Sequence, residues 1–317
     1  MNLFEKQRLG DVCSYLKSGK NIAASEISPS GEYPVFGGNG CRGYTTHYNF
    51  SGDCAIIGRQ GAFCGNVRYF TGNAYMTEHA VIASANNKNS TLNNKINDNL
   101  EQQAQAYFQE LFVDNAASEW SFGTISDLGT VVGGSTPSKA KPEYYTSKGI
   151  AWITPKDLSI NRAKFISHGE NDITELGLKN SSISIMPEGT VLFSSRAPIG
   201  YIAISSGEVT TNQGFKSVVP KPEIGTAFVY YFLKHNLPII EGMASGSTFK
   251  EVSGNIMKNI PVLIPDTKTL VQFNHFCDPI FSQQQILEEQ NQSLANLRDS
   301  LLPKLMSGEL DVSELDI

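Results

Sequence analysis

The sequence is poor in features that mark secreted or membrane proteins. Its N-terminus, Met-Asn-Leu-Phe-Glu-Lys-Gln-Arg, has no apolar stretch of the kind found in a signal peptide. No apolar run approaches the roughly 18 residues that a membrane-spanning helix needs. Hydrophobic residues make up 40% and charged residues 18% of the 317 residues, a globular composition with room for two or three domains. We therefore expect a cytoplasmic protein that is not inserted in a membrane.

Cysteine is also scarce, and its spacing gives little support to a metal site. The five cysteines form no C-x-x-C pair, and the five histidines show no metal-ligand spacing. One interpretation combines the early cysteines with His47 or His79 in a zinc site. We favour the other, in which reduced cysteines are small buried side chains. The cysteines are Cys13, Cys41, Cys54, Cys64 and Cys277.

Positive charge is in deficit, which at first argues against a nucleic-acid partner. Lys and Arg number 25 against 31 Asp and Glu, for a net charge of −6. The deficit is local, however: residues 91–119 carry one basic against five acidic residues, and residues 282–317 carry two against seven. The two long segments are neutral to slightly basic, with 8 against 6 in residues 1–90 and 14 against 13 in residues 120–281. A neutral segment can still present a positive patch to phosphates, so DNA binding stays compatible with the composition.

The chain contains an internal repeat. Residues 52–59 align with residues 189–196, and residues 77–82 align with residues 211–216. Each block is a short apolar run bounded by Gly or Pro, a pattern typical of strands and tight turns. The sequence therefore predicts two related strand-rich modules.

Each module is followed by a helix with apolar residues at helical spacing. We expect the first helix over about 94–113 and an uninterrupted second helix over about 282–302, with Pro279 and Pro303 kinking or bounding it. Thr269 with Gln272 resembles a capping box at the start of the second helical region. Two matched helices favour a pair packed along one seam over separate core helices. The predicted seam residues are Leu100, Tyr107, Leu111, Leu287, Leu294, Leu301 and Leu305.

The two copies differ in length, because the first has no counterpart of roughly residues 222–281. Its strands should still form a local sheet. We expect apolar residues of that sheet to lack part of their cover, unless they pack on the helices, on the second module or on another chain. The residues concerned are Ile56, Ile57, Val67, Val81 and Ile82.

Catalytic motifs fail when their structural context is considered. Residues 36–40 match F-x-G-x-G and residues 38–43 match G-x-G-x-x-G, but the following residues 44–50 are aromatic and β-branched, unlike a helix start. Asp266-Thr267-Lys268 matches half of a nuclease motif, which arises easily by chance. No Ser lies in a G-x-S-x-G elbow. We therefore expect no catalytic residues and no cofactor.

Three segments together resemble the specificity subunits of type I restriction–modification systems. The tail at residues 297–310, Leu-Arg-Asp-Ser-Leu-Leu-Pro-Lys-Leu-Met-Ser-Gly-Glu-Leu, looks like the end of such a subunit. Residues 94–112 look like its central conserved helix. Gly-Gly-Ser-Thr-Pro-Ser at 133–138, followed by Ile-Ala-Trp-Ile-Thr-Pro-Lys-Asp-Leu at 150–158, looks like the opening of a target recognition domain.

The resemblance implies an α+β fold in which two β-rich target recognition modules, the first truncated, are joined by two long antiparallel conserved helices. It implies a shortened first recognition domain at 1–90, a central helix at 91–116, a second recognition domain at 117–281, and a C-terminal helix and tail at 282–317. It also implies double-stranded DNA, methyltransferase subunits and restriction subunits as partners, with catalysis in those subunits. Because the first recognition domain is shortened, we expect it to read bases weakly or not at all, and self-association through the short module is one way to complete a two-part site.

Base reading needs side chains that donate or accept hydrogen bonds at groove edges. For any single candidate, a surface or turn role is the alternative interpretation. A rival for the whole chain is an adhesin-like interaction protein with β modules on a coiled-coil stem, and a second rival is an enzyme that uses the Gly38 loop with S-adenosylmethionine. The candidate reading residues are Ser135, Thr136, Lys139, Lys156, Ser194, Arg196, Asn212, Gln213, Ser247, Thr248 and Lys250, with Arg59 in the first module.

Overall fold

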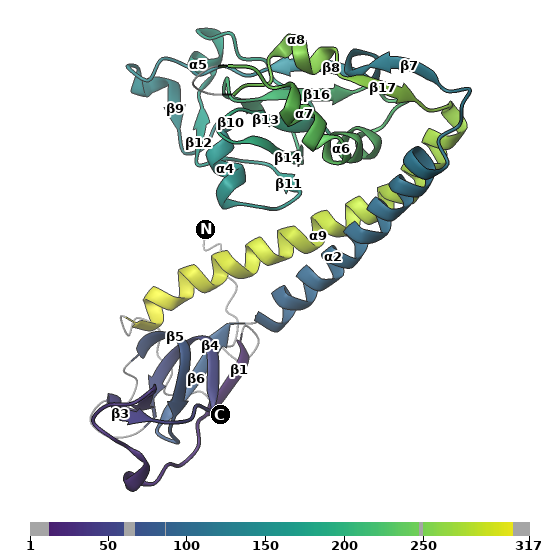
Figure 1. Ribbon diagram of the computed structural model, residues 1–317. Coiled ribbons are helices and arrows are strands. Elements are labelled where there is room, and N and C mark those ends of the chain that lie inside the picture. Colours follow the sequence, from purple (N-terminus) through teal and green to yellow (C-terminus); the bar gives the residue numbers. More distant parts are fainter. Residues whose placement is uncertain (1–12, 60–66, 86, 247–249, 307–317) are drawn as a thin grey trace. The chain divides into compact units, whose positions relative to one another are not determined.

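The computed structural model describes residues 13–59, 67–85, 87–246 and 250–306, which form an α+β fold (Figure 1). The chain divides into two compact units: unit 1 comprises residues 1–96 with 289–317, and unit 2 comprises residues 97–288. The expected order of strands, helix, strands and helix is confirmed. None of the helices in the described ranges is both long and apolar enough to cross a lipid bilayer.

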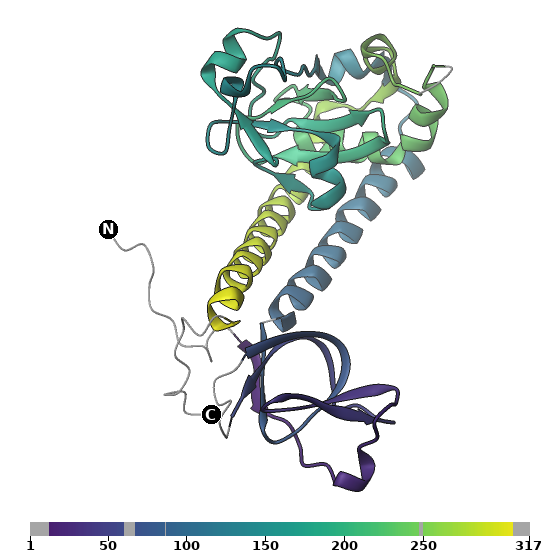
Figure 2. The ribbon, with the colours of Figure 1, turned by 90° about the vertical axis from the view of Figure 1, so that its left-hand side faces the viewer.

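Unit 1 is built on a six-stranded sheet with strand order β1-β6-β4-β5-β2-β3, which is strongly curved (Figure 2). One face buries Ile56 and Ile82 against half-buried Phe36 and Phe70, and the other face forms a second apolar cluster with Leu16 at its edge. The strands are β1 (Cys13–Ser18), β2 (Tyr33–Gly37), β3 (Gly40–Thr45), β4 (Phe50–Gly58), β5 (Val67–Met76) and β6 (Ala80–Ala85).

The apolar residues of this sheet that were expected to need additional cover are buried. These five residues are between 1% and 7% exposed: Ile56, Ile57, Val67, Val81 and Ile82. Ile56 and Ile82 pack in the apolar cluster on one face, and Ile57, Val67 and Val81 pack in the cluster on the other face. The short module therefore buries its strands without a counterpart of residues 222–281.

The glycine-rich motif of unit 1 is a hairpin turn. Gly38 and Asn39 connect β2 to β3, and Gly40 has a φ of 108°, a backbone conformation that favours glycine. A strand follows this turn where a phosphate-binding loop would open a helix. The rejection of a cofactor loop on sequence context therefore agrees with the geometry.

Unit 2 contains a four-stranded sheet, β15-β10-β12-β9, a five-stranded sheet, β11-β14-β13-β16-β8, and the strand pair β17-β7. Helix α6 (Thr226–His235) packs on the five-stranded sheet, and most of its side chains are buried. The strands are β7 (Ser121–Thr124), β8 (Gly129–Gly133), β9 (Tyr145–Thr146), β10 (Ile150–Ile153), β11 (Phe165–Ile166), β12 (Asn171–Ile173), β13 (Val191–Ser195), β14 (Ile199–Ser205), β15 (Thr210–Thr211), β16 (Lys216–Pro220) and β17 (Pro261–Ile264). The short helices are α3 (Ile125–Leu128), α4 (Pro155–Ile160), α5 (Glu175–Lys179), α7 (Leu237–Met243) and α8 (Gly254–Lys258).

Two long helices, α2 (Asn87–Gln109) and α9 (Thr267–Met306), run antiparallel, and each has residues in both units. In unit 2, the Gln284 amide of α9 donates to the Asn97 carbonyl of α2, and the Gln272 amide donates to the Tyr107 hydroxyl. In unit 1, the Asn93 amide donates to the Asn291 side chain over 3.0 Å. A π-helical turn, Glu110–Asp114, follows α2.

Neither proline bounds the second helix, because α9 is one helix of 40 residues that includes Pro279 and Pro303. Both prolines are exposed, while Cys277 and Ile280 beside Pro279 are buried. Packing of that buried stripe outweighs the one backbone hydrogen bond that a proline removes. The capping box at Thr269 is wrong: Asp266 caps α9, accepting from the Thr269 amide over 3.0 Å and from its hydroxyl over 2.7 Å.

The predicted seam residues lie along this helix pair. Leu287 is buried and six per cent exposed, whereas Leu294 and Leu301 are half-buried. Leu100, Tyr107 and Leu111 pack against the main core of unit 2, which includes α6 and the five-stranded sheet. The side chain of Leu305 lies outside the described residues.

The sheets of both units share one pattern of backbone hydrogen bonds, in which loop amides are anchored to strand carbonyls. The matching amide–carbonyl pairs are Gly19–Ala80 and Gly134–Phe215, Lys20–Met76 and Ser135–Thr211, Thr77–Phe36 and Asn212–Ile153, and Arg59–His79 and Ser195–Gly214. Arg59 therefore corresponds to Ser195 and Thr77 to Asn212, so the predicted alignments of residues 52–59 with residues 189–196 and of residues 77–82 with residues 211–216 are each shifted by one residue. The alternation of side chains along a strand makes that shift exchange the two faces of the sheet.

Candidate nucleic-acid interface

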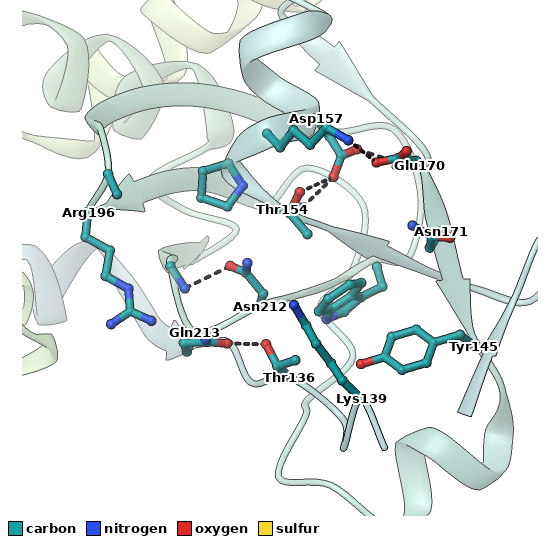
Figure 3. Close-up of a pocket in the computed structure, with 15 residues that line it drawn as sticks. Thr136, Lys139, Tyr145, Thr154, Asp157, Glu170, Asn171, Arg196, Asn212 and Gln213 are labelled. Atoms are coloured by element: carbon teal, nitrogen blue, oxygen red, sulfur yellow. Dashed lines mark hydrogen bonds and ion pairs between the residues drawn. The ribbon is translucent and has the colours of Figure 1, made fainter. Parts of the chain in front are cut away.

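A concavity of about 640 Å³ opens on unit 2 where five loops meet (Figure 3). Six of the predicted reading residues line it, and they come from the segment after β8, the start of α4, the turn after β13 and the β15–β16 loop. These six are Thr136, Lys139, Lys156, Arg196, Asn212 and Gln213. The other lining residues are Tyr145, Trp152, Thr154, Pro155, Asp157, Glu170, Asn171, Ala197 and Gly214.

The loop that carries Thr136 is fixed from several sides. The Ser135 amide donates to the Thr211 carbonyl over 2.9 Å, and the Trp152 indole N–H donates to the Ser135 carbonyl over 3.1 Å. The Thr136 hydroxyl donates to the Gln213 side-chain carbonyl, which joins the two loops across the concavity. The sequence Gly-Gly-Ser-Thr-Pro thus holds its polar side chains in a defined position.

The start of α4 is held by a capping box. Thr154 precedes Pro155 at the first helical position, and the Asp157 carboxylate accepts from the Thr154 amide over 2.7 Å and from its hydroxyl over 2.6 Å. The other oxygen of Asp157 accepts from the Glu170 amide over 2.8 Å, so one buried carboxylate fixes two loops. Both carboxylate oxygens of Asp157 therefore accept hydrogen bonds that hold the fold.

The turn that carries Arg196 is anchored by backbone bonds on both sides. The Ser195 amide donates to the Gly214 carbonyl over 2.7 Å, and the Val252 amide donates to the Ser195 carbonyl over 2.9 Å. Ala197 then reverses the chain with a φ of 48°. The Arg196 guanidinium lies 3.6 Å from Glu251 and its side chain is 37% exposed, so it faces the concavity from a fixed backbone.

The cations of the concavity are only weakly neutralised. Lys156 pairs with Glu170 over 2.5 Å, but these side chains are 62% and 59% exposed, and exposed pairs contribute little binding energy. Lys139 is exposed, and among the described residues no ion pair of Lys139 is found. A polyanion that approaches this surface can therefore compete for three cationic side chains.

Hydrogen bonds to their side-chain oxygens orient the amide groups of Asn212 and Gln213. The side-chain oxygen of Asn212 accepts from the Gly214 amide over 2.8 Å, and that of Gln213 accepts from Thr136. Each side chain thus retains an NH₂ group on the surface of the concavity (Figure 3). Side-chain amides of this kind can donate to acceptors at the edges of bases.

The remaining predicted residues are distributed differently. Ser194 is fully buried in β13, where its hydroxyl donates to the Pro198 carbonyl and accepts from the Tyr201 amide, so its assignment as a reading residue is wrong. Arg59 is exposed in unit 1 and donates to the Ser18 hydroxyl over 3.2 Å. Lys250 is exposed beside the bridge between Ser245 and Glu251. Ser247 and Thr248 lie outside the described residues.

Sequence reasoning missed the aromatic and acidic lining of the concavity. Tyr145 and Trp152 meet edge to face with ring centroids 5.7 Å apart, and Glu170 and Asn171 precede or begin β12. The T-x-x-D spacing after Trp152 was a usable signal for the capping box, since Asp157 follows Thr154 by three residues. No local pattern indicates that Tyr145 lies beside Trp152, because the contact depends on the pairing of β9 and β10 with β12.

The cysteines do not gather into a metal site in the part of the chain that the structure describes, where no three His, Cys, Asp or Glu side chains come close enough together to hold a metal ion. Cys54 and Cys277 are buried, and burial raises the pKa of each thiol to about 12. Cys41 is exposed, so the expectation of buried cysteines is wrong for that residue. Cys64 lies outside the described residues.

Comparisons with known proteins agree with the resemblance in the sequence. The family model described as "Type I restriction modification DNA specificity domain" matches residues 1–109 and 117–296. The chain is 38% identical over 191 residues to the type I restriction enzyme MjaIX specificity subunit of Methanocaldococcus jannaschii, covering 57% of this chain and 44% of that protein. It is 27% identical over 194 residues to the HindI specificity subunit of Haemophilus influenzae, covering 60% of this chain and 42% of that protein.

A solved structure shows the same fold. The S subunit of the type I restriction–modification system from M. genitalium superposes with a TM-score of 0.50 at 14% sequence identity, covering 96% of this chain and 98% of that one. The matched regions span less than half of the length of the two relatives named above. Because the family model matches both strand-rich modules and most of both helices, the chain belongs to the type I restriction–modification DNA specificity domain family.

Proposed function

We propose that this chain is the DNA-reading specificity subunit of a type I restriction–modification complex, and that the concavity of unit 2 contacts double-stranded DNA. The observation that carries the proposal is the convergence of three cations and two amide side chains on loops anchored by backbone hydrogen bonds. Cations neutralise phosphates, and amides read base edges, so this is the residue set that DNA recognition requires. The family of the chain supports the same role.

In this proposal the chain has no catalytic role and needs no cofactor. It works in the cytoplasm, selects the site and holds methyltransferase and restriction subunits, with the two long helices as the assembly surface. An adhesin-like interaction protein is the alternative, and the matched family disfavours it. Phosphate contacts bring a clear physical signature, since displaced counterions make affinity fall as salt rises.

The test is DNA binding by the full chain in complex with its methyltransferase partner, measured between 50 and 200 mM salt. We expect affinity to fall steeply over this range, and Arg196→Ala to weaken binding and flatten the salt dependence. Lys148→Ala is the matched control, because Lys148 is an exposed cation of unit 2 that does not line the concavity. Salt-independent binding, or equal effects of the two variants, would contradict the proposal.

Base reading by the amides needs a second measurement. We expect Gln213→Ala to relax the methylated motif at one position, since a lost base contact costs about 1–3 kcal/mol of discrimination. Sequencing of methylated sites would reveal it. We further propose that the short first module reads weakly or not at all, so that the motif contains one specified half-site, alone or repeated as a palindrome through pairing of two chains. Two different well-specified half-sites in one complex would refute that part.

A further inference from the structure

A cluster of buried charges, none of which lines the concavity, lies inside unit 2 where the strand-rich module meets the helix pair. Lys164, just before β11, forms an ion pair with Glu101 of α2, and their side chains are 6% and 19% exposed. Lys234 of α6 pairs with the same carboxylate over 2.6 Å. Burial alone would raise the pKa of Glu101, but the two lysines together lower it to about 2, so the carboxylate is charged in the folded protein.

Polar side chains of α6 and α9 complete the cluster. The Lys164 ammonium donates to the Gln284 side chain of α9 over 2.7 Å, and the Tyr231 hydroxyl of α6 donates to Glu101 over 2.9 Å. Glu288 of α9 accepts from the backbone amides of Lys164 and Phe165 over 2.9 and 3.0 Å. One lysine is thereby held by α2, α6 and α9 at once.

The same lysine is tied to the sheet that carries the concavity. The Ile204 amide of β14 donates to the Lys164 carbonyl over 2.7 Å, and β14 pairs with β13, which leads directly into Arg196. The ring of Phe281 lies with its centroid 4.3 Å from the ammonium. The cluster thus connects the helix pair to the sheet whose loops form the proposed reading surface.

Stability is a weak reason for such a cluster. Desolvation of two charges offsets most of their attraction, and apolar residues of similar volume in such a place are often equally or more stable. Hydrogen bonds near 3 Å impose a direction that apolar contacts lack. A rotation of about 6.5° shifts the far edge of a domain about 30 Å wide by about 3.4 Å, which is one base-pair step.

We infer that Lys164 and Glu101 are positioning residues that set the angle between the recognition module and the helix pair, and thereby which base pairs the module reaches. They contact no DNA themselves. The effect on base spacing rests on the proposed function, whereas the effect on the angle does not.

The test compares two charge-removing double variants of the full chain. Lys164→Met with Glu101→Gln removes the buried ion pair. The amide oxygen introduced by Glu101→Gln can still accept the hydrogen bond of the Tyr231 hydroxyl. Lys179→Met with Glu175→Gln makes the same changes at an ion pair on α5 whose side chains are 72% and 81% exposed. Thermal unfolding first establishes that each variant folds.

The angle is measured without DNA, as the distance distribution between spin labels at Lys148 in the module and Gln283 on α9, both exposed. We expect the distribution to shift or broaden in the buried-pair variant and to stay unchanged in the control. If the buried-pair variant does not fold, Lys234→Met, which removes the more exposed cation of the cluster, should give a smaller change in the same direction. An unchanged distribution in the variant that folds overturns the inference.

Spacing is measured by sequencing methylated sites with the methyltransferase present. The wild-type complex should prefer sites with the recognised bases at the correct position over sites in which they are shifted by one base pair. We expect this preference to fall about tenfold in the buried-pair variant, which is the effect of one lost base contact. An unchanged preference together with a changed distance would overturn the link to reading. If the wild-type complex methylates no defined motif, the proposed function fails, while the distance measurement still decides the role of the cluster.

Discussion

Phe273 of α9 lies at an aromatic crossing of the helix pair. It is fully buried, and its ring lies 5.0 to 6.1 Å from the rings of Tyr107, Phe108, Phe112 and Tyr231. Phe→Ala in such a site costs about 3–5 kcal/mol, against a typical total stability of 5–15 kcal/mol. We therefore expect Phe273→Ala to remove a large part of the stability of unit 2.

The same helix offers a matched control. Phe276 is 38% exposed, and its ring contacts Tyr107 with a centroid distance of 4.6 Å. Loss of one such ring contact costs about 0.5–1.5 kcal/mol. We expect the two Phe→Ala variants of the same chain to differ by about 2 kcal/mol or more.

Urea unfolding followed by tryptophan fluorescence measures this difference. The two tryptophans of the sequence, Trp120 and Trp152, lie in unit 2, so the signal reports that unit. Equal slopes with denaturant are required before midpoints are compared. Equal losses for Phe273→Ala and Phe276→Ala would refute the view that this aromatic crossing holds the helices together.

Three further outcomes follow from the structure. Glu101→Gln should be most destabilising above pH 4.5 and progressively less so towards pH 2. The lowered pKa of the Glu101 carboxylate contributes stability that is lost as pH falls from the pKa of the unfolded chain to that of the folded chain. Acid unfolding of the wild type and of the variant measures this difference. Asp157→Ala should cost about 1–2 kcal/mol in urea unfolding through loss of the cap, whereas an unaffected protein would show that the loops do not need it. Leu294→Ala with Leu301→Ala should reduce helix content in circular dichroism and, if the helix pair is the assembly surface, abolish co-purification with the methyltransferase; retained capture would place that surface elsewhere.

The repeat and its helices were predictable because they depend on local patterns. Apolar runs between glycines indicate strands, and apolar residues every three or four positions indicate helices. The ends of the second helix were not predictable in this way. A proline signals a helix end locally, and only the burial of Cys277 and Ile280 in the finished core keeps α9 continuous through Pro279.

The residues of the candidate site also fall into those that local patterns predict and those that depend on tertiary contacts. Thr136, Asn212 and Gln213 could be found from glycine-flanked loops, and they do line the concavity. Ser194 could not be separated from them, because its orientation follows from the pairing of β13 with β14. Glu101 and Lys164 escaped notice for a similar reason: nothing near either residue in the sequence indicates its partner.

The backbone pattern common to both units bears on how new specificities arise. Its anchors are amides and carbonyls, which every residue except proline supplies in full, so loop side chains can change while the anchors stay intact. Substitutions at positions such as Asn212 and Gln213 should therefore be tolerated by the fold even when they alter the surface. A recognition protein built in this way can diversify its targets by mutation or by exchange of whole loops, with little penalty in folding.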